Sequence, residues 1–484
     1  MAFTKYDIVL NLFWKFAERC GSQGISFVVT VFLARILMPE DYGLVALVQI
    51  FLTILSVFVD NGMGVALIQK KDADELDFSS VFILNTFIGV ILYVALWLCA
   101  PYIERFYSVT ELTVLIRVMG ITLIIAAWRS VQQAYISRKM KFKCYFYATL
   151  VSSALSAVVG IGMAIEGVGV WALVAQQLIN NIAGVIVVDK IISWRPSMNF
   201  SFRRVAGLFS YGWKLLLSAV LDTGYNQLWQ LLIGKFYSPS DLAYFNQGQK
   251  FPSLIVTNIN ASIDSILLPV MSNVQEDHNR VKEMTRHAME TSIFIMAPIM
   301  MIMAFSAENI VMLVLTDKWL PCVPFFVVYC IIYMFYPLHT ANLNAIKALG
   351  RSDLFLGMEV IKKIVGIAVL LYTMQYGLLV MAYGLLVMSG ISQLVNSWPN
   401  HKLLKYGYFQ QMRDILPAII LAVMAGGIVW LIGRVELPLA MVIFFQVVAG
   451  GVAYISMAWL FKLTSLRYVY EVFLKMKNKN EGIE

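Results

Sequence analysis

The stretch SSVFILNTFIGVILYVALWLCAP, residues 79–101, contains no charged side chain. A helix needs about 20 mostly apolar residues to cross the hydrocarbon core of a bilayer, so this stretch predicts a transmembrane helix. A transmembrane strand would be about half as long and would alternate apolar with polar residues, which this stretch does not do. These residues therefore indicate a helical membrane protein.

Comparable apolar stretches recur along the whole chain of 484 residues, of which 60% are hydrophobic and 14% are charged. Soluble domains are about 45–50% apolar and about 25% charged, so the composition excludes a soluble enzyme and a disordered or fibrous chain. The pattern predicts an all-α polytopic membrane protein with about fourteen transmembrane helices. The predicted spans are residues 8–37, 43–62, 79–101, 112–132, 145–165, 169–192, 207–232, 242–272, 287–306, 320–341, 355–375, 377–398, 415–433 and 437–461.

Motifs for cofactors and catalysis are missing from the sequence. The five cysteines form no CxxC pair, so we expect neither a disulfide framework nor a metal site. The sequence also lacks a GxxxxGK[ST] phosphate loop, an HExxH motif and a dinucleotide fingerprint. We therefore expect no cofactor, no catalytic residues and no nucleic-acid partner, and any uphill transport would draw its energy from elsewhere.

Lysine and arginine are unequally distributed between the two sides of the membrane. With the N-terminus in the cytoplasm, 24 of the 37 Lys and Arg residues fall on the cytoplasmic side, four on the outer side and nine within the predicted spans. Cytoplasmic loops carry the excess of positive charge in membrane proteins. The distribution therefore predicts that both termini are cytoplasmic.

Two stretches 200 residues apart resemble each other: VFLARILMPEDYGLVALVQI from Val31 and LLIGKFYSPSDLAYFNQGQK from Leu231. The alignment pairs Pro39 with Pro239, Asp41 with Asp241, Gln49 with Gln249 and Arg35 with Lys235. A second match, Trp14-Lys15 with Trp213-Lys214, lies upstream at an offset of 199. Any membrane hairpin could use Pro and Asp in this way, and the separate Trp-Lys match favours a true repeat.

The repeat predicts how the chain is organised. Its offset spans six helices, an even number, so the two halves have the same orientation, as in some secondary transporters that bind substrate between their halves. We expect a six-helix lobe at residues 1–200, a second six-helix lobe at 201–400, two additional transmembrane helices at 401–461 and a basic cytoplasmic tail at 462–484.

Cations inside the membrane are the candidate substrate contacts. Each charge at the bilayer centre costs about 2.5–3.5 kcal/mol on insertion scales, so we expect most of these residues to line a polar cavity or to reach the interface. The candidates for a cationic, substrate-binding cavity are Lys15, Arg19, Lys214, Arg129, Arg35 and Lys250. The alternative for several of them is a helix-end anchor, and snorkelling is the expectation for Lys362 and Lys363.

Asp222 is the acid nearest the middle of a predicted span, and we expect it to couple transport to an ion. A salt bridge between two helices is the alternative role. Amides accompany it in the same span and in two others, and they favour a polar interior because isolated amides would be unsatisfied in lipid. The polar residues of these spans are Asn226, Gln227, Gln230, Asn246, Gln247, Asn258, Asn260, Asp264, His339, Asn342 and Asn344.

Several short motifs resemble one known family. They are ARILMPEDYGLVALV (34–48), DNGMGVALIQKKD (60–72), QQAYISRKMKFK (132–143) and NAIKALGRSD (344–353). In this order and spacing, the chain resembles the Wzx-type polysaccharide flippases, nearest to the WzxC-like or teichuronic-acid exporter branch of the MATE-related exporter superfamily.

This resemblance implies a MATE-like fold in the bacterial plasma membrane and export of undecaprenyl-pyrophosphate-linked oligosaccharide for surface polysaccharide synthesis. It also implies alternating access coupled to protons or sodium. The partners it suggests are the lipid-linked glycan, membrane lipid, and the polymerase and export machinery of the same pathway. Cationic residues on the first and seventh helices of the family match Lys15, Arg19 and Lys214 by position.

Two other functions remain open from the sequence. A MATE-type multidrug or cation antiporter would share the fold, but its path should contain more acids than bases, and these spans show the reverse. A membrane polysaccharide polymerase or ligase should carry a large outer loop with catalytic groups, and all outer loops here are short. We therefore expect a transporter and not an enzyme.

The charge distribution makes a testable prediction about orientation. Single cysteines at Lys139 and Lys318, each in a background without native cysteines, should differ in reactivity toward an impermeant thiol reagent in intact cells. Only Lys318→Cys should react, because position 139 lies on the cytoplasmic side. Labelling of Lys139→Cys in intact cells would disprove the predicted topology.

Overall fold

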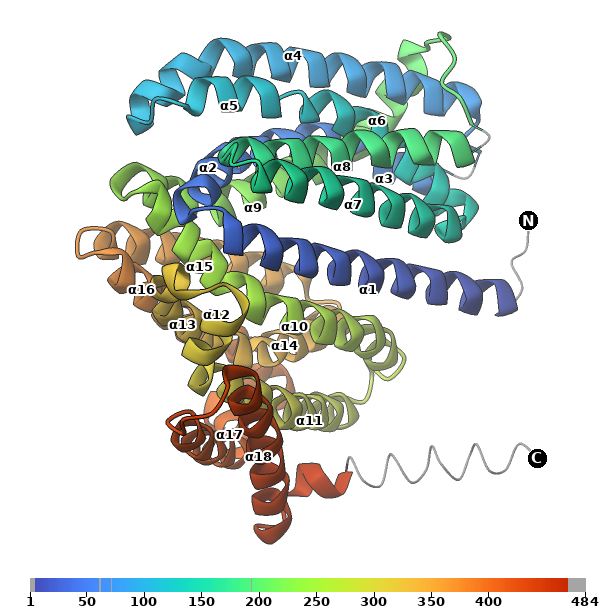
Figure 1. Ribbon diagram of the computed structural model, residues 1–484. Helices are drawn as coiled ribbons and strands as arrows, with labels where there is room; N and C mark the ends of the chain where they lie inside the picture. The colour runs from blue at the N-terminus through green and yellow to red at the C-terminus, as the bar shows by residue number, and fades with distance from the viewer. Residues whose placement is uncertain (1–4, 61, 71, 193, 469–484) are drawn as a thin grey trace. The chain divides into compact units, whose positions relative to one another are not determined.

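The computed structural model describes residues 5–60, 62–70, 72–192 and 194–468 (Figure 1). Helices make up its regular structure, and the described residues contain no strand. The helices of the first half are α1 (Lys5–Ile36), α2 (Pro39–Asp60), α3 (Met63–Gln69), α4 (Glu75–Tyr107), α5 (Leu112–Met119), α6 (Thr122–Lys139), α7 (Phe142–Ile165), α8 (Val170–Ile191) and α9 (Phe202–Phe236). Those of the second half are α10 (Pro239–Ser272), α11 (His278–Phe305), α12 (Ala307–Val314), the 3-10 helix η1 (Asp317–Cys322), α13 (Val323–Met334), α14 (Tyr336–Ala348), α15 (Ser352–Thr373), α16 (Leu378–Leu404), α17 (Tyr408–Ile432) and α18 (Leu439–Leu460).

The predicted all-α polytopic membrane fold is confirmed. In the described ranges, 11 helical segments are long and apolar enough to cross a membrane, or 12 if the bent helix α9 is included. Of the fourteen predicted spans, those on α1, α9 and α15 fall outside the 11. Each of these three helices carries several charged residues, which lower its mean hydropathy.

Two predicted spans are interrupted helices. The span at 112–132 divides into α5 and α6 around Gly120, and the span at 320–341 divides into α13 and α14 around Phe335. Pro337 lies in the first turn of α14, where its missing N–H costs no hydrogen bond. The breaks fall in the fourth and tenth predicted spans, which occupy equivalent places in the two halves of the repeat.

The Pro-Asp turn is the same in both halves of the chain. The backbone N–H of Met38 donates to Oδ2 of Asp41 at 3.0 Å, and the N–H of Ser238 donates to Oδ2 of Asp241 at 3.1 Å. In each case the carboxylate also lies in the first turn of a helix, at the positive end of the helix dipole. The repeat predicted from the sequence therefore extends to the local hydrogen bonding.

The chain divides into two units, Met1–Ala243 and Tyr244–Glu484. Helix α9 belongs to the first unit because it packs against α2, α3 and α4. Contacts thus group α9 with the helices before it, whereas the lobe boundary expected at residue 200 follows the sequence repeat. The lobes at 1–200 and 201–400 remain a prediction about the repeat.

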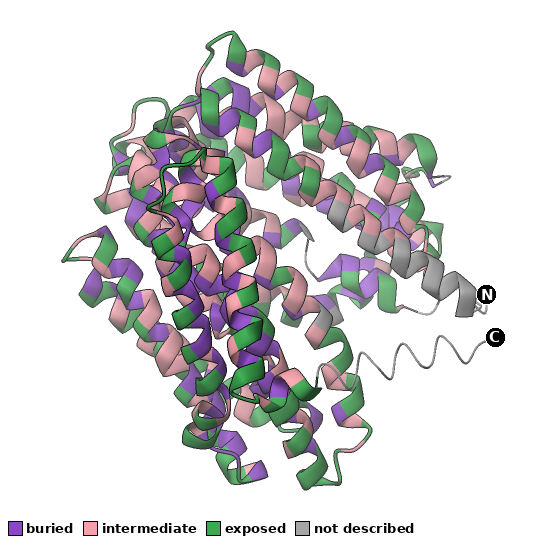
Figure 2. Cartoon of the chain, turned by 60° about the horizontal axis from the view of Figure 1, so that its bottom comes forward, coloured by how far each residue is buried: buried purple, intermediate pink, exposed green. Residues whose placement is uncertain are grey.

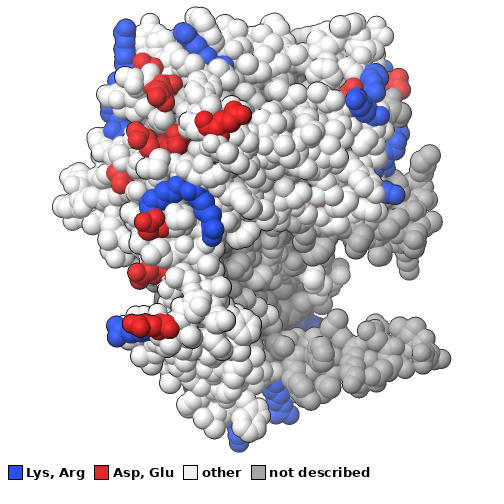
Figure 3. Space-filling view, in the orientation of Figure 1, with Lys and Arg blue, Asp and Glu red and all other residues white. Residues whose placement is uncertain are grey.

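Lipid-facing and interior residues share the same helices. Exposed apolar side chains such as Val158 (73% exposed) and Ile364 (63%) recur along the helices, beside buried positions (Figure 2). On the face drawn in Figure 3, the charged side chains of the first unit gather toward the two ends of its helices, with an uncharged band between them. Both distributions suit a protein that crosses the bilayer.

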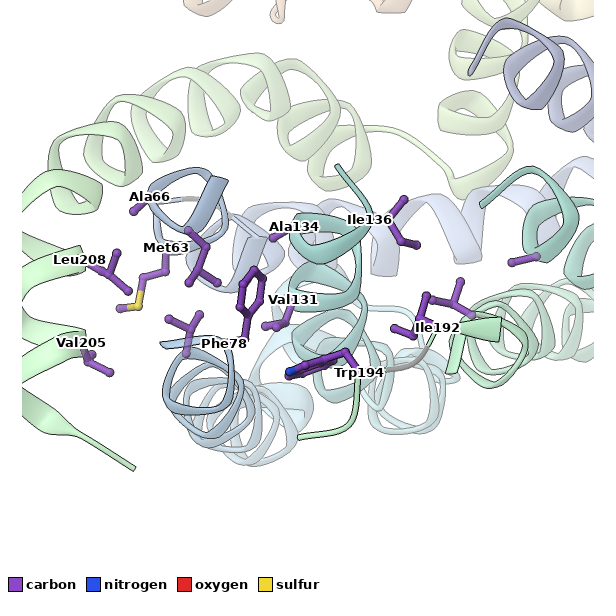
Figure 4. Packing of buried hydrophobic residues seen from close by; sticks show 14 residues of the cluster. Met63, Ala66, Phe78, Val131, Ala134, Ile136, Ile192, Trp194, Val205 and Leu208 are labelled. Carbon is purple, nitrogen blue, oxygen red and sulfur yellow. The ribbon is translucent and has the colours of Figure 1, made fainter. Parts of the chain in front are cut away.

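A hydrophobic core closes one end of the first unit, at the residues expected on the cytoplasmic side. Residues from α3, α4, α6 and α9 pack around Phe78 and Trp194 (Figure 4). The ring of Trp194, in the segment after α8, stacks on Tyr135 with centroids 6.1 Å apart. Val205 and Leu208 of α9 complete the cluster.

A charged network borders this core. Asp77 is completely buried, and Nζ of Lys70 donates to both of its carboxylate oxygens at 2.7 Å. Arg204 of α9 lies 3.3 Å from Asp77 and 2.6 Å from Asp74. The N–H of Asp77 and the Arg204 guanidinium both donate to Asp74, and they lower the pKa of that carboxyl group. Arg138 donates to the carbonyls of Leu67 and Lys70, so the loop before α4 is held from three helices.

We predict that Asp77→Asn destabilises the protein. The substitution removes the buried anion opposite Lys70 and Arg204, whose side chains are 35% and 36% exposed. Because water can still reach both cations, the cost should be that of a charged hydrogen bond, about 1.5–3 kcal/mol, and should fall below the 3–5 kcal/mol typical of a fully buried pair. Thermal unfolding of the purified protein would measure the loss.

Asp353→Asn is the matched control. Arg351 lowers the pKa of Asp353 to about 2, so this carboxylate is also ionised at neutral pH, but both partners are exposed. The control variant should unfold at nearly the wild-type temperature. Equal unfolding temperatures for both variants would show that the buried network contributes no more to stability than the exposed ion pair does.

Candidate polar substrate site

A polar pocket lies inside the first unit, among α1, α6, α7 and α8. Its cavity volume is about 90 Å³. Among the described residues, its lining contains one cationic side chain, amides and hydroxyl groups, and no carboxylate. The lining residues are Ser22, Arg129, Gln132, Tyr145, Ala148, Thr149, Ser152, Ser153, Asn180, Asn181, Gly184 and Val188.

Arg129 and Gln132 enter the pocket from α6. They are three residues apart, which places them on one face of the helix. Nη1 of Arg129 donates to Oδ1 of Asn181 at 3.1 Å, and Nε2 of Gln132 donates to the carbonyl of Val185 at 3.2 Å. Gln132 is 1% exposed, and its Oε1 is a buried acceptor with no hydrogen-bond partner in the structure. Both polar contacts therefore bind α6 to α8 and leave one acceptor open.

The hydroxyl groups of α7 line the facing wall. Thr149 donates to the carbonyl of Tyr145 at 2.9 Å, and Ser152 donates to the carbonyl of Thr149 at 3.1 Å. A serine or threonine in a membrane helix satisfies its own O–H in this way and can still accept a hydrogen bond. The wall is therefore polar without carrying charge.

Of the predicted cations whose side chains the structure describes, Arg129 is the one that lines this pocket. The side chains of Lys15 and Arg19 lie outside the described residues, although both positions belong to α1. Arg35 is exposed in the last turn of α1, and Lys214 is exposed on α9. Lys250 is half-buried on α10, in the second unit.

Asp222 is exposed on α9, eight residues after Lys214. Nδ2 of Asn226, one turn further on, donates to its carboxylate at 3.3 Å. Nζ of Lys362 lies 2.5 Å from Oε1 of Glu359, one turn earlier on α15, and the side chain is 13% exposed. This ion pair compensates the charge of Lys362, and the snorkelling expected for Lys362 and Lys363 stays a prediction.

A second polar cluster lies in the second unit, at α14, α16 and α17. Asn342 exchanges hydrogen bonds with Gln411 at 3.0 Å, and Asn400 donates to Oδ1 of Asn342 at 2.6 Å. Asn396 lies 3.0 Å from Nδ1 of His339. The sequence marked His339 and Asn342 as polar interior residues, and their partners Asn396, Asn400 and Gln411 were missed.

Gln132, Asn180 and Asn181 were missed in the same way. The spacing of Asn396 and Asn400, four residues apart on one helix face, was the available signal for the second cluster.

The described ranges contain no group of three or more His, Cys, Asp or Glu residues that could hold a metal ion.

A cavity of about 730 Å³ in the second unit is mostly apolar. Met358, Trp398 and Phe409 are among its lining residues, from α15, α16 and α17. Its Asp353 is already paired with Arg351 at the rim. The chemistry of this cavity suits hydrocarbon and not a polar substrate.

Named relatives come from surface polysaccharide pathways. The chain is 24% identical over 408 residues to the teichuronic acid biosynthesis protein TuaB of Bacillus subtilis, covering 82% of this chain and 84% of TuaB. It is 19% identical to the lipopolysaccharide biosynthesis protein WzxC of Escherichia coli, covering 70% and 69%. It is 22% identical to the succinoglycan biosynthesis transport protein ExoT of Rhizobium meliloti, covering 64% of this chain and 63% of ExoT.

Solved structures show the fold. The lipid II flippase MurJ in an inward closed conformation matches with a TM-score of 0.73 and 14% identity, over 94% of this chain and 98% of that one. An inward-facing MATE multidrug transporter of the MOP superfamily matches with a TM-score of 0.61 and 13% identity, over 82% and 95%. The predicted MATE-like architecture is confirmed.

The family model described as "Polysaccharide biosynthesis protein" matches residues 32–324, more than half of the chain. This range includes the Pro-Asp turn of both halves, the charged network around Asp77 and the polar pocket around Arg129. The chain is a multi-pass membrane protein and belongs to this polysaccharide biosynthesis family.

Proposed function

We propose that the protein is a flippase that moves undecaprenyl-pyrophosphate-linked oligosaccharide units across the bacterial plasma membrane for surface polysaccharide synthesis. The observation that carries this proposal is membership of a polysaccharide biosynthesis family together with a MurJ-like fold along 94% of the chain. The names of TuaB, WzxC and ExoT point to the same kind of pathway.

The negative charge of the proposed substrate matches the positive charge in the polar pocket. A pyrophosphate headgroup is anionic, and Arg129 lines a pocket whose described walls contain no acid. The lipid tail can remain in the bilayer while the headgroup follows a polar path, so no helix has to bury the tail. The substrate partners are the lipid-linked glycan and membrane lipid, and we propose the polymerase and export machinery of the same pathway as protein partners.

Two alternatives are less well supported. A MATE-type drug or cation antiporter shares the fold, but a path for cations favours acids, and the polar pocket holds an arginine. A polysaccharide polymerase or ligase would need reacting groups brought together, and the name of ExoT, a transport protein, favours a transporter over an enzyme.

Orientation and energy supply belong to the same proposal. Both termini would be cytoplasmic, as the positive-inside distribution predicts. Transport would follow alternating access. It would be coupled to an ion gradient through a group that binds a proton or a sodium ion.

The function is tested by deleting the gene in its host and analysing undecaprenyl-linked glycolipids. A blocked flippase should trap one complete repeat unit on the cytoplasmic face of the membrane. Restoration of the wild-type gene should remove the accumulated glycolipid. Unchanged glycolipids together with new drug sensitivity would favour the antiporter instead.

We predict that Lys15 and Lys214, which match in the sequence repeat, contact the anionic headgroup. Lys214→Ala, and the double variant with Lys15→Ala, should reduce export severalfold while membrane protein levels stay normal. Lys318→Ala removes a cation from the short 3-10 helix η1 and serves as the control. Normal export in the double variant would show that both lysines are only helix anchors.

Asp222 is our candidate for ion coupling. Its carboxylate is exposed on α9 and accepts a hydrogen bond from Nδ2 of Asn226. In our proposal this carboxylate binds the coupling proton or sodium ion. In proteoliposomes, Asp222→Asn should still bind substrate but lose the dependence of transport on the ion gradient, whereas Glu276→Gln in an exposed loop should retain it. Wild-type gradient dependence in the Asn variant would leave Asp222 a structural role.

A further inference from the structure

The polar pocket of the first unit has an open acceptor beside a cation. Gln132 is buried, and its Oε1 has no hydrogen-bond partner in the structure, although its Nε2 is engaged by the Val185 carbonyl. Arg129, on the same face of α6, uses one nitrogen on Asn181 and has further N–H groups to donate. A ligand that satisfies both residues must accept from the guanidinium and donate to the amide oxygen.

The position equivalent to Gln132 in the second half of the repeat holds an amide whose hydrogen bonds are all made to other groups of the protein. Met140 follows α6 and Gly350 lies just after α14, and both residues have a left-handed backbone conformation. Aligning these two residues gives an offset of 210, which pairs Gln132 with Asn342. Both amides are 1% exposed. Asn342 uses its Oδ1 on Asn400 and Gln411 and its Nδ2 on Gln411.

The open Oε1 of Gln132 is therefore a difference between two equivalent buried positions. Leaving a buried acceptor unpaired is unfavourable, so a partner from outside the protein would be bound favourably there. The hydroxyl groups of Thr149 and Ser152 on α7 and the amide of Asn180 on α8 would surround such a partner.

The size of the pocket limits what can enter. A water molecule occupies roughly 30 Å³ of the liquid, so a cavity of about 90 Å³ holds about three water-sized groups. An entire hexose is too large. A single oxyanion with one neighbouring hydroxyl group fits, and it supplies the acceptor and the donor that Arg129 and Gln132 require.

We propose that this pocket binds an oxyanion of the transported glycolipid together with an adjacent sugar hydroxyl group. The guanidinium of Arg129 holds the oxyanion, and the hydroxyl group donates to Oε1 of Gln132. This inference rests on the proposed function and adds a specificity site to it. The oxyanion has two possible sources: the carboxylate of an acidic sugar, or the phosphate that links the first sugar to the lipid.

The test measures binding to the purified full-length protein in lipid nanodiscs by titration calorimetry. The probes are methyl glucuronide for the acidic sugar, glucose 1-phosphate for the linking phosphate and methyl glucoside as the neutral reference. Wild-type protein should bind one of the two anionic probes at least about tenfold more tightly than methyl glucoside, because hydrogen bonds to charged groups are the strong ones.

Three variants locate the binding. Arg129→Gln should weaken binding of the preferred anion at least about tenfold, and Gln132→Met should weaken it severalfold while preserving side-chain length. Arg117→Gln is the matched control, because Arg117 stacks on Trp97 at 4.0 Å and does not line the pocket. It should bind like wild type, and thermal unfolding of each variant checks that the fold persists.

The outcomes identify the source of the oxyanion and decide whether the inference holds. Preference for methyl glucuronide assigns the site to an acidic sugar, and preference for glucose 1-phosphate assigns it to the linking phosphate. Equal binding of all three probes, or anion binding that survives Arg129→Gln, would overturn the inference and leave a pocket that holds water. Glycolipid accumulation after gene deletion does not depend on this pocket, so the proposed function can stand even where the binding test fails.

Discussion

Hydrogen-bond satisfaction away from water is the constraint on which the whole structure depends. Hydrocarbon offers no partner for a backbone N–H or C=O group, so each spanning segment is a helix that satisfies its own backbone. Side chains obey the same rule within the helices: Thr285 donates to the carbonyl of Val281 at 2.7 Å, and Ser306 donates to that of Ile302 at 2.6 Å. Amides such as Gln132 and Asn85 reach between helices, and these groups contribute to the polar interior.

Charged side chains also need partners away from water, and leaving one unpaired costs more free energy than leaving a neutral group unpaired. Where a carboxylate is buried at the end of the first unit, as at Asp77, cations from two other segments surround it. Where a lysine lies within a span, as at Lys362, an acid one turn away pairs with it. The pocket around Arg129 departs from this pattern, because an amide, and no carboxylate, accepts from the guanidinium. That excess of donors is the basis of our proposal that the pocket binds an anion.

The fold was predictable because apolar length and charge distribution are properties of the sequence alone. The all-α class and the Pro-Asp repeat followed from stretches such as 79–101 and from the match of Asp41 with Asp241. The helix break beside Phe335 was not anticipated, since apolar residues continue through it. Arg129 was identified as a polar interior residue, but its pairing with Asn181, 52 positions away, depends on how α6 and α8 pack. The ion pair of Lys362 with Glu359, one turn earlier on the same helix, was also missed, although its spacing of three residues is visible in the sequence.

The segment between α8 and α9 has a consequence for how the protein is made. This connection is docked on the first unit: the N–H of Ser197 donates to Ser79, the N–H of Ser201 donates to Ser80, and Trp194 is buried in the core. Val205 and Leu208, which follow it, belong to that same core. During synthesis the ribosome delivers these residues only after six predicted spans have been inserted. This end of the first unit must therefore wait, with Phe78 and its neighbours incompletely covered, until the beginning of α9 leaves the exit tunnel.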